Sequence, residues 1–274
     1  MKIYGIDFTS RPSSRKPLTC LECNLEGDVL RAEALIEWSR FEAFEAALIR
    51  PGPWIAGIDF PFGLPRKFIE NIGWPTQWAN YVEYVRTMGR RGFRGVLDAY
   101  RSSRPAGDKE HRRTTDIAAG SISPQKIYGT PVGLMFFEGA PRLRDSGVTI
   151  PGLLAGDPAR IVVETYPGML ARSIIGRRSY KEDTKSKQTT QQHQARKDLL
   201  AEIVDGAAKA LYGFNVSVVM DLTADPSGDQ LDALLCAIQA ASAWRLRTSS
   251  FGIPEGTDSV EGWIVGATIT KSCS

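Results

Sequence analysis

The chain has 274 residues, of which 42% are hydrophobic and 24% charged, and its formal net charge is +3. This composition is typical of a soluble globular protein and excludes a disordered tail, a collagen-like fibre and a disulfide-stapled miniprotein. No apolar run approaches the roughly 20 residues that cross a bilayer. Asp7 lies within the apolar N-terminal stretch, whereas a secretory signal has an uninterrupted apolar segment. We therefore expect a cytoplasmic protein with no membrane partner.

The first part of the chain predicts four strands and one helix. Residues 2–8, 18–25 and 29–36 have the apolar, β-branched pattern of strands. Apolar side chains at helical spacing follow Ser39, and a Pro-Gly-Pro segment ends that helix. Residues 54–60 then predict a fourth strand, which a proline-rich turn ends.

The middle of the chain is less regular. Residues 66–104 predict mostly helix, whereas residues 105–160, rich in Gly and Pro, predict loops and short turns. A β-branched strand is expected at 160–164, and a polar loop at 179–194.

The last part predicts a helix near 195–211, a short strand or helix end at 216–220 and a final strand at 261–270. Between them, residues 228–246 form the clearest predicted helix. No charged residue occurs from Ala233 to Trp244, so this helix should be buried on most of its surface. The simplest organisation is one α/β domain over residues 1–274 with an insertion at about 66–155.

Two aspartates end predicted strands in an identical context. The tetrapeptide Gly-Ile-Asp-Phe occurs at 5–8 and again at 57–60. If these strands are parallel neighbours, they lie ~4.8 Å apart and Asp7 meets Asp59. Two adjacent carboxylates repel, so they either take up a proton or bind a divalent cation. Hydrogen bonds from neighbouring loops to two buried aspartates are the alternative.

Three further acids are candidates by the same logic. Glu164 ends the predicted strand at 160–164, where a structural ion pair with Arg160 or Arg172 is the alternative role. Asp229 and Asp232 are three residues apart on the last predicted helix and therefore point the same way. Their alternative role is to interact with the dipole at the helix N-terminus.

Basic residues are concentrated in two segments. Residues 86–126 hold ten Lys and Arg against four acids, and residues 172–197 hold eight against two, so each segment carries +6. Such stretches favour binding of a polyanion, although solvated helix faces with internal salt bridges are the common alternative. The candidate nucleic-acid-binding residues are Arg90, Arg91, Arg94, Arg112, Arg113, Lys126, Arg177 and Arg178.

Four motifs in order resemble a known family. They are GIDF at residue 5, GIDFPFGLP at 57, ETYPG at 164 and DQLDALLCA at 229. Together they resemble the domain-of-unknown-function 429 family, which is regarded as a branch of the RNase H-like superfamily. The resemblance spans most of the chain. It implies an RNase H-like α/β fold with a mixed five-stranded sheet, order 3-2-1-4-5, flanked by helices, with an insertion after strand 4.

The resemblance also implies a site. Asp7 would bridge two metal ions, Asp59 and Asp232 would be further ligands, and Asp229 or Glu164 would complete the catalytic acids. Two Mg²⁺ or Mn²⁺ ions would activate water and stabilise the leaving oxygen of a phosphodiester. We therefore expect a metal-dependent nuclease acting on DNA or RNA by a two-metal-ion mechanism.

Two other classes stay open. Residues 5–15 also resemble the phosphate-binding hairpin of sugar kinases and actin-like ATPases, where the Asp holds Mg²⁺ and residues such as Thr9 and Ser10 contact phosphates. The short chain and the lack of a Gly-rich adenosine segment argue against such a phosphotransferase. A non-catalytic scaffold that binds nucleic acid or protein is the third class.

Overall fold

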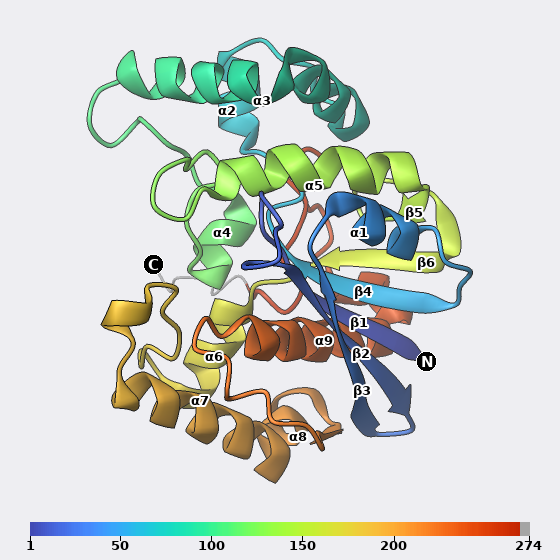
Figure 1. The fold of residues 1–274 in the computed structure, drawn as a ribbon. Helices are drawn as coiled ribbons and strands as arrows, with labels where there is room; N and C mark the ends of the chain where they lie inside the picture. The colour runs from blue at the N-terminus through green and yellow to red at the C-terminus, as the bar shows by residue number, and fades with distance from the viewer. Residues whose placement is uncertain (269–274) are drawn as a thin grey trace, which may run out of the picture.

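A mixed sheet of seven strands forms the centre of the computed structural model, which describes residues 1–268 (Figure 1). The strand order is β5-β6-β4-β1-β2-β3-β7, and β2 is antiparallel to both of its neighbours. All other pairs are parallel. The strands are β1 Lys2–Asp7, β2 Leu18–Glu26, β3 Val29–Trp38, β4 Trp54–Asp59, β5 Val148–Thr149, β6 Asp157–Glu164 and β7 Asn215–Ser217.

The sheet is wider than the five strands expected from the sequence. The strands predicted up to residue 60 and the strand at 160–164 are present and adjacent, and the short β5 and β7 extend the sheet at its two edges. The predicted strand at 261–270 is wrong for its described part. Within residues 261–268 only Ile264 forms a single bridge, to Glu164, while residues 269 and 270 lie outside the described residues.

Helices cover both faces of the sheet (Figure 1). One apolar cluster joins the sheet to α1 Phe41–Leu48, α2 Arg66–Asn71, α3 Trp78–Ser102 and α5 Val132–Ser146. A second cluster joins the opposite face to α6 Pro167–Ile175, α7 Thr190–Glu202, α8 Ala208–Tyr212 and α9 Asp229–Arg245. The remaining elements are α4 Thr114–Ala119, the 3₁₀ turns η1 Lys185–Lys187 and η3 Arg247–Gly252, and the π-helical turn η2 Ile203–Ala207.

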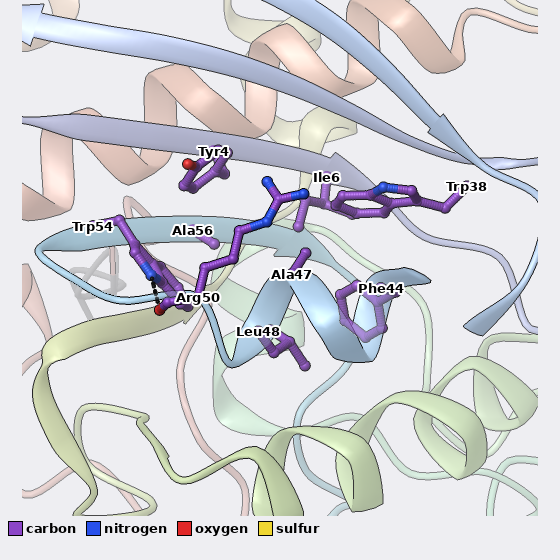
Figure 2. Close-up of a pocket in the computed structure, with 9 residues that line it drawn as sticks. All are labelled: Tyr4, Ile6, Trp38, Phe44, Ala47, Leu48, Arg50, Trp54 and Ala56. Carbon is purple, nitrogen blue, oxygen red and sulfur yellow. Dashed lines mark hydrogen bonds between the residues drawn. The ribbon is translucent and has the colours of Figure 1, made fainter. Parts of the chain in front are cut away.

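The part of the first face under α1 is closed core rather than a binding site. Figure 2 shows α1 packed on the sheet, with Phe44 and Leu48 beside Ile6 and Trp54. The Trp54 indole donates a hydrogen bond to the Arg50 carbonyl at 3.0 Å. About 20 Å³ of space remains among these side chains, which is room for no more than a water molecule or so.

The prediction of loops over residues 105–160 is wrong, because α4 and the fifteen-residue α5 lie there. Glycines hide the helical period of α5, and close packing explains them. A Cβ on Gly139 would lie 2.3 Å from the Phe60 ring, and one on Gly133 would lie 2.8 Å from the Pro124 carbonyl oxygen. Similarly, α7 begins at Thr190, inside the segment predicted as a polar loop.

The chain between β4 and β6 holds α2, α3, α4, α5 and β5. Gly89, with a φ of 70°, interrupts α3. No helix in the described part of the chain is long and apolar enough to cross a membrane.

Candidate metal centre

The two copies of Gly-Ile-Asp-Phe lie side by side. Strands β1 and β4 are parallel neighbours, and their register pairs Gly5 with Gly57 and Asp7 with Asp59. Residues two apart on a strand share a face, so each Asp projects on the same side of the sheet as its Gly. This places two carboxylates together where both strands end.

The glycines of these copies let α9 approach the sheet. A Cβ on Gly5 would lie 1.9 Å from the Ala233 carbonyl oxygen, and one on Gly57 would lie 2.5 Å from the Cys236 carbonyl oxygen. The helix backbone therefore rests directly on the two strands. Its first turns then carry Asp232 to the pair of strand aspartates.

Asp7, Asp59 and Asp232 form one carboxylate cluster. Each offers one oxygen, and these oxygens all lie within 4.8 Å of one another. Asp232 is fully buried and Asp7 nearly so, while Asp59 is partly exposed. Carboxylate oxygens are the ligands that Mg²⁺ and Mn²⁺ prefer, so the donor set fits a hard divalent cation.

Burial and the repulsion of neighbouring carboxylates raise the pKa of two members of the cluster, Asp7 and Asp59. Burial, followed by the charges of Asp229 and Asp232, raises the pKa of Asp7 well above its ordinary value. Burial raises the pKa of Asp59 to about 7, although the Lys181 ammonium opposes this. Protons therefore compete with a divalent ion for these two carboxyls.

Asp229 lies beside the cluster rather than in it. It is the first residue of α9, and its carboxylate accepts a hydrogen bond from Lys16 Nζ at 2.8 Å. The start of the helix is capped by Asp225 instead, whose carboxylate accepts from the Asp229 amide at 2.9 Å. The Asp229 carboxylate is thus available to the cleft that it lines with Asp7.

Three residues at the site were not found from the sequence. The Tyr180 hydroxyl donates to Asp232 at 2.5 Å, and the Lys181 ammonium forms an ion pair with the same carboxylate. Lys16 bridges Asp229 and Asp183, with 2.8 Å to each carboxylate oxygen. These residues lie in loops without periodic pattern, so only the net basic charge of residues 172–197 hinted at Lys181.

Glu164 belongs to a buried ion-pair network. Its carboxylate accepts from Arg113 Nη2 at 2.5 Å and Nη1 at 2.9 Å, and from the Phe62 amide at 2.9 Å. Arg113 pairs equally with Asp116, at 2.8 Å from Nη2. The structural ion pair foreseen for Glu164 is therefore present, but its partner is Arg113 rather than Arg160 or Arg172. Glu164 holds the loop after Asp59 in place.

Arg113 cannot act as a surface contact for nucleic acid. Its side chain is 1% exposed, and its guanidinium is surrounded by the carboxylates of Asp116 and Glu164. Sequence alone could not reveal this, because Glu164 is 51 residues away along the chain.

The other predicted nucleic-acid-binding residues fall into two groups. Arg90 binds the Ser10 carbonyl oxygen at 2.9 Å and pairs with Glu138, so it ties α3 to the loop after Asp7. Arg91 and Arg94 also lie on α3, which Figure 1 places beyond α5 from the sheet. Arg112 and Lys126 follow α3 in the chain and complete this first group.

The second group, Arg177 and Arg178, lies close to the cluster. Both line a cleft of about 520 Å³, the arginine cleft, together with Arg172, Asp59 and Lys181. Arg178 also pairs with Asp198 at 2.6 Å. Guanidinium groups and a carboxylate that could hold a metal ion thus share one continuous surface.

Two further clefts open at the same point. The metal cleft, about 430 Å³, is lined by Asp7, Lys16 and Asp229, and the inner cavity, about 250 Å³, is lined by the ion-pair network of Arg113. Asp59 and Lys181 line all three spaces. A ligand bound at the cluster could therefore extend in three directions.

The fold and the site define an α/β protein with a carboxylate cluster at the carboxyl ends of two central parallel strands. The chain belongs to the family described as a protein of unknown function (DUF429), which it matches over residues 5–256. No curated protein and no solved structure matches the chain.

Proposed function

We propose that this protein is a metal-dependent nuclease of the RNase H-like class, which hydrolyses phosphodiester bonds by a two-metal-ion mechanism. The convergence of Asp7, Asp59 and Asp232 from three separate elements carries the proposal. Bringing three acids together, two of them buried, is costly unless a cation compensates them. The neighbourhood of β3, β2, β1, β4 and β6, with β2 antiparallel, is compatible with that class.

The three aspartates would hold Mg²⁺ or Mn²⁺, with Asp229 as a further acid at the edge of the metal cleft. Bound ions would supply Lewis-acid activation of water and of the phosphate oxygens. In the hydrolysis the oxygen of water forms a bond to phosphorus, one P–O ester bond breaks and the leaving oxygen takes up a proton. Lys181 and Lys16, which pair with Asp232 and with Asp229 in this structure, place ammonium groups beside the reacting phosphate.

The arginine cleft is suited to the rest of the substrate. Arg172, Arg177 and Arg178 line it, and guanidinium groups bind phosphate oxygens in a fixed, bidentate geometry. A chain with a phosphate at the cluster could continue its backbone along these side chains. The proposed partner is therefore a nucleic acid, DNA or RNA.

Asp7→Asn tests the function. We expect Mn²⁺-dependent cleavage of single-stranded or structured DNA or RNA by the wild type and a loss of at least 100-fold in the variant, because removal of a central charge-stabilising group costs about that much. Asp205→Asn, at an exposed aspartate that lines none of the three clefts, is the control. Absence of both cleavage and calorimetric Mn²⁺ binding in the wild type would refute the proposal.

A further inference from the structure

The inner cavity is a separate space that begins beside the carboxylate cluster. It holds about 250 Å³ and begins at Asp59, so it adjoins the place proposed for the reacting phosphate. Pockets for drug-sized ligands start near 300 Å³, so this space suits one small ring system. A base pair in a duplex is too wide for it.

The charge of the cavity wall excludes a phosphate group. Arg113 is the guanidinium in this wall, and an arginine has five N–H donors. Two donate to Asp116, two to Glu164 and one to the Glu261 carbonyl oxygen. No Arg113 donor remains for an anion, and the one other cation that lines the cavity, Lys181, forms an ion pair with Asp232. Three carboxylates, those of Asp59, Asp116 and Glu164, line the same cavity. The wall therefore favours a neutral ligand.

The remaining lining suits a flat ring with a polar edge. Tyr166 lines both this cavity and the arginine cleft, and the Arg172 guanidinium lies 5.2 Å from its ring centroid. Phe60, Pro61 and Met135 supply apolar wall. Polar residues accompany them, because Ser121, Thr130 and Thr165 line the cavity.

We propose that the inner cavity binds an unpaired nucleobase, that of the nucleotide whose phosphate lies at the carboxylate cluster. This inference rests on the proposed function and specifies its substrate as a single-stranded or extruded nucleotide. The backbone phosphates then follow the arginine cleft, while the neutral base enters the cavity that repels them. Enzymes that act on a base outside the duplex likewise bind it in a pocket between apolar side chains and polar groups.

Binding of nucleosides without metal tests the cavity alone. Adenosine, guanosine, cytidine and uridine are titrated against the full chain in EDTA by amide NMR, with ribose as the base-free probe. We expect at least one nucleoside to bind tenfold or more tightly than ribose and to shift the Thr165 and Tyr166 amide signals. Equal response to all nucleosides and to ribose would overturn the proposal.

A matched pair of variants locates the site. Ile122 lines the cavity and is 43% exposed, whereas Ile117 is 61% exposed and lines none of the three clefts. Ile122→Trp should weaken nucleoside binding at least tenfold by filling the cavity mouth, and Ile117→Trp should leave it unchanged. Equal effects of the two variants would place the bound nucleoside elsewhere and overturn the proposal.

Cleavage of oligonucleotides separates this inference from the proposed function. A strand with an abasic nucleotide at the cleaved position should react at least tenfold more slowly than the same strand with its base. Equal rates would refute the base pocket and leave the nuclease in place. Nucleoside binding without Mn²⁺ binding or cleavage would refute the nuclease and retain the pocket.

Discussion

At the scale of single residues, the protonation of Asp59 links stability to metal binding. Its pKa is raised to about 7, so the folded protein keeps a proton that the unfolded chain loses near pH 4. A group with a raised acid pKa in the folded state makes the free energy of unfolding fall as pH rises between these values. The metal-free protein is thus weakened at neutral pH by the very carboxylate that would bind the ion.

Asp59→Asn tests this linkage. In EDTA, the variant should gain stability relative to the wild type as pH rises from 4 to 7, by on the order of 3 kcal/mol, since the Asp59 pKa is raised from 3.8 to about 7 and one pKa unit corresponds to ~1.4 kcal/mol. Denaturant unfolding at several pH values measures it. Asp205→Asn should show no such gain. A pH-independent difference between Asp59→Asn and the wild type would contradict the assigned pKa.

At the scale of elements, contact of α9 with β1 and β4 positions the cluster. Gly57 faces the Cys236 carbonyl oxygen and the Thr165 methyl, where a Cβ would lie within 2.6 Å of both. The helix would have to move away from the sheet to admit an alanine. Because α9 carries Asp232, such a movement would also separate the ligands.

Gly57→Ala should therefore reduce both stability and Mn²⁺ affinity. Overpacking costs about 1–3 kcal/mol of unfolding free energy, and more where backbone is the obstacle. Gly95→Ala on α3 is the control, because no atom lies within 4 Å of its Cβ position and alanine favours helix. Thermal unfolding and calorimetry measure the two effects. A Gly57→Ala protein as stable as wild type would show that α9 does not rest on the sheet as described.

At the scale of the whole molecule, the sequence predicted what regular patterns encode. The repeated tetrapeptide indicated that Asp7 and Asp59 lie together, and the uncharged run that follows Asp232 indicated that this residue lies on a buried helix. Residues that reach the site from loops, such as Lys16 and Lys181, have no period to reveal them. The role of Arg113 depended on a contact distant in sequence, and α5 was hidden by glycines that close packing requires.

The charge of the chain is unevenly distributed along the sequence. A net charge of +3 combines two basic segments with an acidic remainder that contains the carboxylate cluster. In the structure, the second basic segment supplies Arg172, Arg177, Arg178 and Lys181 around Asp59, whereas much of the first lies on α3. Only the second segment therefore contributes positive charge directly to the proposed substrate path.

Anomalous diffraction from crystals soaked in Mn²⁺ tests the central claim most directly. The account predicts two manganese peaks in contact with the carboxylates of Asp7, Asp59 and Asp232, and their loss in Asp7→Asn crystals. Two-metal sites hold their ions about 3.5–4 Å apart, so the peaks should show that separation. Crystals in which manganese binds elsewhere, while the Lys181 ammonium stays on Asp232, would contradict the account.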